Sequence, residues 1–302
     1  MEKLKFLIIF ITLYCVVSED NNENTPVVFW HGMGDSCCFP FSLGKLKKLI
    51  ESELNHTVYV KSLEIGGSLV RDYESSYFIH PQKQIQDACD QIKRDPILSN
   101  RTFNAIGFSQ GSQFLRALIQ KCPAVKVKNL ITVGGQHQGV YGLPNCPSLT
   151  EKSCEYLRQI LNFAAYAGWV QNFLVQATYW HDPMNEDAYK AKSTFLAEIN
   201  NEKTVNNDYI NRLQTLEKFV MIKFANDTIV QPVETSWFGF YKPGSSSELQ
   251  TLEESEIFLK DRLGLKKMKE DGKIVFLSTE GNHMQINLKW FTENVINNYL
   301  RD

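Results

Sequence analysis

The stretch that decides the fold is FNAIGFSQGS, residues 103–112. Its apolar run ends at Phe108 and leads directly into Ser109, and residues 112–121 then place their apolar side chains at helical spacing. This pattern predicts a buried strand, a sharp turn and an amphipathic helix. Residues 107–111 match G-x-S-x-G, in which the two glycines allow the tight turn that keeps the serine hydroxyl exposed. We therefore expect Ser109 to be a nucleophile.

Similar apolar runs, each ended by glycine or by polar residues, lie on both sides of this segment. Strands that are apolar throughout and alternate with helices are typical of a parallel sheet covered on both faces. The sequence therefore predicts an α/β fold. Beyond residues 103–108, the expected strands are 26–30, 57–65, 130–133, 219–222 and 273–277, and further helices are expected at 82–92 and 286–300.

The alternation of strands and helices stops between about residues 140 and 216, where helical spacing of apolar residues takes over. We predict a helical insertion within a single domain that spans residues 19–302. Two interpretations have equal weight. The helices could simply pack on the sheet, or they could form a cap that lines an apolar groove, in which case Trp169, Phe173 and Leu174 would contact the substrate.

Length and charge limit the classes of protein to consider. The 302 residues are 43% hydrophobic and 22% charged, which fits a packed protein of one domain with an insertion or of two domains. The 32 Lys and Arg residues nearly balance 34 Asp and Glu residues, giving a formal net charge of −2. Because no surplus of positive charge is available to bind phosphate, we expect no nucleic-acid partner.

The first 18 residues have the composition of a signal peptide. Lys3 and Lys5 precede an apolar run at 6–17 and then Ser18, a small residue at a cleavage position. The run of about twelve apolar residues is too short for a membrane anchor, which needs ~20. We therefore expect export without a stable membrane span. Three glycosylation sequons agree with this route, at Asn55, Asn100 and Asn226.

Six cysteines remain after removal of the leader, namely Cys37, Cys38, Cys89, Cys122, Cys146 and Cys154. An even number in an oxidising compartment suggests disulfides, although six cysteines allow many pairings. Cys146 and Cys154 are close enough to close one short loop, and Cys37 and Cys38 could pair with each other or belong to separate bridges. Neither a C-x-x-C motif nor histidines at ligand spacing occur, so we predict no metal site.

A serine nucleophile needs an imidazole base and a carboxylate that orients the imidazole. Asp227 follows the strand expected at 219–222, and His283 follows the last expected strand, which gives the order Ser, Asp, His. Both positions belong to the carboxyl edge of the sheet, where active sites of open α/β sheets form. Asp208 is a weaker candidate for the acid because it precedes its strand. The other histidines are less suitable as the base: His31, His56, His80, His137 and His181.

Acyl transfer also requires donors for the negative charge that develops on the carbonyl oxygen. One donor should be the backbone N–H of Gln110, the residue after the nucleophile. The other should come from the loop at residues 31–34, which follows the first strand, and Met33 is the best candidate. His31 is well placed to shape this loop.

Five motifs in chain order, together with residues 237–241, resemble the palmitoyl-protein thioesterase family, and in particular its lysosomal type 1 members. The motifs are VFWHGMGDSCC at 28–38, IGFSQG at 106–111, GGQHQGV at 134–140, FAND at 224–227 and TEGNH at 279–283. The similarity covers nearly the whole mature chain. It implies an α/β-hydrolase fold, with a mostly parallel central sheet, helices on both faces and inserted helices that build part of an acyl groove.

The resemblance also implies an activity, namely hydrolysis of palmitoyl and other long-chain acyl groups from S-acylated cysteines of proteins or peptides in the lysosome, without a cofactor. It assigns Ser109 as nucleophile, Asp227 as acid and His283 as base, with Met33 and Gln110 at the oxyanion hole. The implied disulfides are Cys37–Cys38, Cys89–Cys122 and Cys146–Cys154. Two alternatives remain: an ester-specific lipase or carboxylesterase with the same triad, and a lipid-binding protein without catalytic activity.

Overall fold

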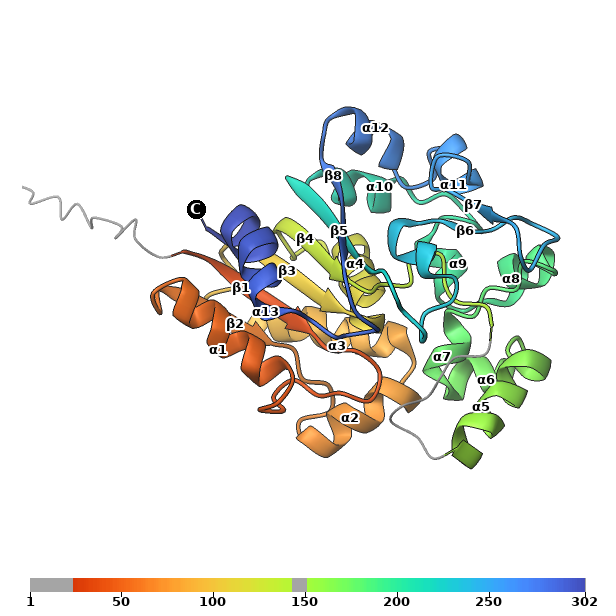
Figure 1. Cartoon of the computed structure of the whole chain (residues 1–302), viewed down its shortest axis with the longest axis horizontal. Coiled ribbons are helices and arrows are strands. Elements are labelled where there is room, and N and C mark those ends of the chain that lie inside the picture. The colour runs from red at the N-terminus through yellow and green to blue at the C-terminus, as the bar shows by residue number, and fades with distance from the viewer. Residues whose placement is uncertain (1–23, 143–150, 302) are drawn as a thin grey trace, which may run out of the picture.

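The computed structural model describes residues 24–142 and 151–301, so the expected signal peptide and Cys146 lie outside the described residues. Its centre is a parallel sheet of six strands in the order β2-β1-β3-β4-β5-β8 (Figure 1). The predicted α/β fold with a parallel sheet is thereby confirmed. The strands are β1 (Asn24–Trp30), β2 (Val58–Ser62), β3 (Phe103–Phe108), β4 (Val127–Val133), β5 (Lys218–Phe224) and β8 (Ile274–Thr279).

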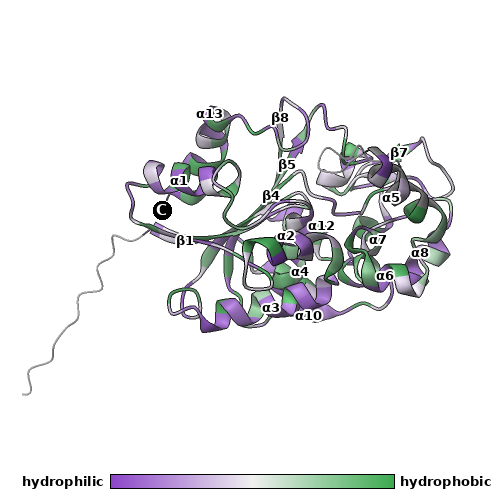
Figure 2. Ribbon diagram, turned by 90° about the horizontal axis from the view of Figure 1, so that it is seen from below, coloured by the Kyte–Doolittle hydropathy of each residue, from purple (hydrophilic) through white to green (hydrophobic). Residues whose placement is uncertain are grey.

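Both faces of the sheet are buried because successive apolar side chains of a strand point to opposite faces. In β5, Phe219 and Met221 belong to one core cluster, and Val220 and Ile222 belong to the other. The first cluster is covered by α3 (Pro81–Arg94) and α4 (Gln110–Lys121). The second is covered by α1 (Leu43–Glu53), α13 (Leu288–Phe291) and the π-helix η2 (Thr292–Leu300). Figure 2 shows α1 and α13 on one side of the sheet and α3 and α4 on the other.

Strands β4 and β5 are neighbours in the sheet, yet the helical segment lies between them in sequence. Its described helices are α5 (Glu151–Ala164), α6 (Gly168–Phe173), α7 (Val175–Thr178), α8 (Glu186–Lys192), α9 (Leu196–Ile199) and α10 (Asn207–Gln214). Helices α5 to α7 enclose a small apolar cluster of their own around Leu161, Val170 and Trp180. They lie beside the carboxyl ends of the strands in Figure 1, whereas α10 packs on α4.

Several elements differ from the sequence prediction. The prediction contained neither α1 nor α2 (Leu69–Phe78). It also did not contain the short strands β6 (Phe240–Tyr241) and β7 (Leu249–Gln250), which pair antiparallel. The remaining elements are η1 (Val233–Trp237), α11 (Glu256–Leu259) and α12 (Leu265–Glu270). Within 24–142 and 151–301, no helix is both long and apolar enough to cross a bilayer.

Candidate active site

Ser109 lies on a strained turn between β3 and α4. Its φ is +50° and its ψ is −123°, a backbone conformation that residues other than glycine rarely adopt. Close packing of the neighbouring glycines holds this turn. A Cβ on Gly107 would lie 2.6 Å from the carbonyl oxygen of Gly111, and a Cβ on Gly111 would lie 2.3 Å from that of Trp30. The turn therefore requires both glycines of the motif.

The structure brings Ser109, Asp227 and His283 together at the carboxyl edge of the sheet. Nε2 of His283 lies 2.9 Å from Oγ of Ser109, and Nδ1 of His283 lies 2.6 Å from Oδ2 of Asp227. The other carboxylate oxygen of Asp227 accepts hydrogen bonds from the backbone N–H groups of Ile229 and Val230, at 2.8 and 2.9 Å. Because the carboxylate accepts the Nδ1 proton, Nε2 is free to accept the serine proton.

The expected oxyanion loop lies directly against the serine. A Cβ added to Gly32 would be 2.9 Å from Cβ of Ser109, so only glycine allows this approach. Met33 lines the same cavity as Ser109 and His283. Gln110 is the first residue of α4, where backbone N–H groups have no partner within the helix and carry partial positive charge. Both predicted donors therefore belong to segments that border the serine.

Gln136 also contacts the serine and was missed by the sequence analysis. Its Nε2 donates to Oγ of Ser109 at 3.1 Å and to the carbonyl oxygen of Gly134 at 3.1 Å. Since this nitrogen can only donate, the serine hydroxyl accepts from Gln136 and is left to donate to His283. Gln136 follows the carboxyl end of β4, so its place along the chain offered a signal that could have identified it.

A cavity of about 360 Å³ opens beside Ser109 and His283. Its apolar wall comes from the segment between β1 and α1, from α1 itself, and from the segments that follow β5 and β8. The apolar residues are Met33, Phe41, Leu43, Leu46, Ile229, Met284, Ile286 and Leu288. Trp169, Phe173 and Leu174 do not line it: Trp169 and Phe173 are 65% and 58% exposed, and Leu174 is buried in the apolar cluster of the insertion. Their assignment to an acyl groove stays a prediction.

Two disulfides lie within the described residues, Cys37–Cys38 in the loop that follows β1 and Cys89–Cys122 between α3 and the end of α4. These are two of the three pairs that the family resemblance implies. The third pair falls outside the described residues because Cys146 and the side chain of Cys154 are not described. All three sequon asparagines, Asn55, Asn100 and Asn226, are exposed.

A serine on a strained turn after a parallel strand, in hydrogen-bond contact with an imidazole from the end of another strand, is the arrangement of the α/β-hydrolases. The chain is an enzyme of this class. The family model of palmitoyl protein thioesterases matches residues 26–283. The chain therefore belongs to the palmitoyl-protein thioesterase family.

Individual relatives agree with this assignment. The chain is 45% identical over 277 residues to Palmitoyl-protein thioesterase 1 of Caenorhabditis elegans, covering 92% of each protein. It is 33% identical over 286 residues to Palmitoyl-protein thioesterase 3 of Dictyostelium discoideum, covering 94% of this chain and 92% of the relative. Among solved structures, the mature form of a Bacillus licheniformis lipase has a TM-score of 0.46 at 15% identity, over 92% of this chain and 93% of the lipase.

Proposed function

We propose that this protein hydrolyses palmitoyl and other long-chain fatty acyl thioesters of cysteine in proteins or peptides, through an acyl-serine intermediate. The observation that carries the proposal is the continuous hydrogen-bonded path from Ser109 Oγ through His283 to Asp227 beside an apolar cavity. Membership in the family supports the thioester as the bond that is cleaved, and the names of the two relatives support the palmitoyl group.

The first half of the reaction acylates the enzyme. Ser109 Oγ attacks the thioester carbonyl while Nε2 of His283 takes the serine proton, and the negative charge on the carbonyl oxygen is stabilised by the backbone N–H groups of Met33 and Gln110. The tetrahedral species collapses, the carbon–sulfur bond breaks, and the cysteine sulfur leaves with the proton from the imidazolium. The acyl group is then held on Ser109 as an ester.

The second half releases the fatty acid. His283 takes a proton from water, which attacks the acyl-serine carbonyl, and the imidazolium returns the proton to Ser109 Oγ as the fatty acid leaves. Asp227 stabilises the imidazolium in both halves and remains a carboxylate. A thiolate is a good leaving group, so most of the catalytic work is orientation of the acyl chain and stabilisation of the oxyanion.

We propose the cavity beside Ser109 as the site of the acyl chain, because its apolar side chains begin next to the reacting serine. The alternative is the groove predicted from the sequence, along Trp169 and Phe173 of the insertion.

We also propose that the chain is a lumenal glycoprotein of the lysosome. The apolar leader at residues 1–18 and the three exposed sequons support entry into the secretory pathway. A human relative that is 28% identical over 253 residues is named a lysosomal thioesterase. In this proposal residues 19–302 form one hydrolase domain with a helical insertion at about 140–216.

A pair of matched substrates tests the proposed function: a peptide with S-palmitoyl cysteine and the same peptide with O-palmitoyl serine. We expect the thioester to be the better substrate by kcat/KM, and a strong preference for the oxygen ester would identify an ester-specific lipase instead. Ser109→Ala should lose at least ~10³-fold in kcat while it still binds the acyl peptide. The exposed Ser246→Ala variant is the control and should keep full activity.

A further inference from the structure

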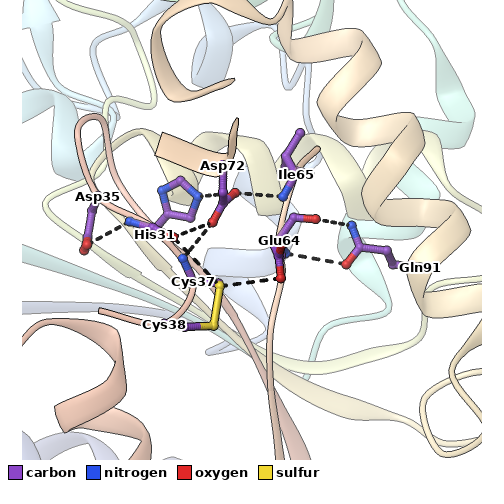
Figure 3. Close-up of a disulfide and its surroundings, with 9 residues drawn as sticks. His31, Asp35, Cys37, Cys38, Glu64, Ile65, Asp72 and Gln91 are labelled. Carbon is purple, nitrogen blue, oxygen red and sulfur yellow. Dashed lines mark hydrogen bonds and ion pairs between the residues drawn. A yellow bond between two sulfur atoms is a disulfide. The ribbon is translucent and has the colours of Figure 1, made fainter. Parts of the chain in front are cut away.

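The loop that carries Met33 is tied to α2 by a buried pair of side chains that the proposed mechanism does not use. Nε2 of His31 lies 3.0 Å from Oδ1 of Asp72 (Figure 3). Nδ1 of His31 lies 2.8 Å from the carbonyl oxygen of Gly32. The two side chains are 2% and 0% exposed.

The hydrogen-bond partners of this pair determine its charge. Asp72 receives donors on both oxygens: the Ile65 N–H at 2.7 Å on Oδ1, and the Cys37 N–H at 2.7 Å and the Ser36 hydroxyl at 3.0 Å on Oδ2. Asp72 is therefore an ionised carboxylate. A carboxylate and a backbone carbonyl can only accept, so both ring nitrogens of His31 must donate. The ring is a buried imidazolium.

The electrostatic surroundings agree with this charge state. Burial lowers the pKa of His31, but the hydrogen bond and charge of Asp72, the Gly32 carbonyl and the charge of Asp35 outweigh burial and raise the pKa above its ordinary value. Burial likewise raises the pKa of Asp72, but His31 and the N–H groups of Ile65 and Cys37 bring that pKa below its ordinary value. The two groups stabilise each other's charged forms.

The planar peptide bond links His31 to the proposed oxyanion donor. The carbonyl of Gly32 and the N–H of Met33 belong to one trans peptide group, so they point in opposite directions. A hydrogen bond from His31 to that carbonyl therefore fixes the direction of the Met33 N–H, which points away from the His31 ring. The positive charge on the ring also polarises the peptide group and makes its N–H a stronger donor.

We propose that His31 is a positioning residue, which Asp72 holds in place so that it orients and polarises the Gly32–Met33 peptide group and prepares the Met33 N–H to stabilise the oxyanion. The proposal rests on the proposed function, because an oxyanion forms only if acyl transfer takes place at Ser109. His31 itself does not touch the substrate.

Two substitutions separate positioning from simple structural support. His31→Asn keeps a donor near the place of Nδ1, where it can reach the Gly32 carbonyl, but it cannot reach Asp72. His31→Gln keeps a donor near the place of Nε2, where it can reach Asp72, but it leaves the Gly32 carbonyl without that partner. We expect kcat for the S-palmitoyl peptide to fall in both variants, by ~10²-fold in His31→Gln and by less in His31→Asn, with little change in KM.

Thermal stability should follow the opposite order, with His31→Gln more stable than His31→Asn because a buried carboxylate keeps its partner. A purely structural role would make the more stable variant the more active one. It cannot explain a higher kcat in the less stable variant. The proposal is wrong if His31→Gln, the more stable variant, also has the higher kcat. It is also wrong if the substitutions raise KM and leave kcat unchanged.

A further test uses the wild-type protein, so it does not require that any variant folds. With ¹⁵N-labelled histidine, NMR at pH 7 should show both ring nitrogens of His31 protonated, and a neutral ring would overturn the proposal. The result is independent of the test of function. Full activity in Ser109→Ala would contradict the proposed function, whereas full activity in His31→Gln with normal dependence on Ser109 would contradict only the positioning role.

Discussion

Ser109 combines two features that its role as the proposed nucleophile requires. Its side chain borders the cavity, and the surrounding packing sustains a positive φ that costs roughly 1–3 kcal/mol. Its hydroxyl has two partners with different functions, since Gln136 donates to it and His283 accepts from it. The orientation of the serine proton toward the imidazole is therefore set before substrate binds.

Asp227 determines which nitrogen of His283 carries the proton, and its replacement tests that role. Asp227→Asn should lower kcat by ~10⁴-fold with little change in KM, because an amide N–H facing Nδ1 favours the tautomer that cannot accept the serine proton. Steady-state kinetics with the S-palmitoyl peptide measures the effect. Asp208→Asn is the matched control, since the side chain of Asp208 is 69% exposed, and it should keep full activity. Equal losses in the two variants would refute the role of Asp227.

The three side chains of the Ser, Asp, His order could be predicted because each follows the end of an apolar strand, a position visible in the sequence. Gln136 also follows the end of a strand, but the Ser, Asp, His pattern used in the prediction includes no amide side chain. The link between His31 and Asp72 joins residues 41 positions apart. It depends on the packing of α2, which the sequence did not reveal.

At the scale of elements, β3 was predicted with its observed bounds, whereas α2 was missed entirely. Helix α2 buries Asp72, Ser75, Ser76 and Tyr77, while Val70 is 68% exposed. Asp72 and Ser76 face inward, where they accept hydrogen bonds from the backbone N–H groups of Cys37, Ile65 and Gly34. A search for apolar periodicity cannot find such a helix, since the pattern on its buried face is inverted.

The acyl chain could lie in the cavity beside Ser109 or along the helical insertion. One substitution at each place tests which of the two binds it. Ile286→Trp should fill the cavity that α1 and the segment after β8 form, and raise KM for a palmitoyl thioester while leaving an acetyl thioester unaffected. Trp169→Ala on α6 removes an exposed ring outside that cavity and should change neither KM. The reverse pattern would place the acyl chain along the insertion, which was one of the two interpretations of the sequence.

At the scale of the whole molecule, the strand order brings four loops to one edge of the sheet. The carboxyl ends of β1, β3, β5 and β8 lead into the proposed oxyanion loop, nucleophile, acid and base, although β1 and β8 lie at opposite ends of the chain. The individual strands could be predicted, but their order in the sheet could not, because no local pattern specifies which strands pair.

The two disulfides should differ in what they stabilise. Cys89 and Cys122 are 33 residues apart, so the double Cys→Ala variant should lose about 3–4 kcal/mol of unfolding free energy through the added entropy of the unfolded chain. Its kcat at low temperature should be unchanged. Cys37 and Cys38 are adjacent and close no such loop, but the Cys37 N–H donates to Asp72. The double Cys→Ala variant at Cys37 and Cys38 should lose little unfolding free energy. Its kcat should fall further than that of the Cys89 and Cys122 variant.

Denaturant unfolding and steady-state kinetics on the two double variants measure these effects side by side. Equal losses of stability would show that loop closure does not govern the contribution of either disulfide. A large loss of kcat in the Cys89 and Cys122 variant under conditions where it is fully folded would show that this bridge acts on the site.

Transfer of the acyl group to the hydroxyl of Ser109 can be tested directly by trapping the acyl-enzyme. The protein is mixed with the S-palmitoyl peptide, quenched in acid during turnover, digested and analysed by mass spectrometry. We predict a palmitoyl ester on Ser109 that is absent from the Ser109→Ala protein. A palmitoyl group found on a different residue, or undiminished hydrolysis by Ser109→Ala, would contradict acyl transfer through Ser109.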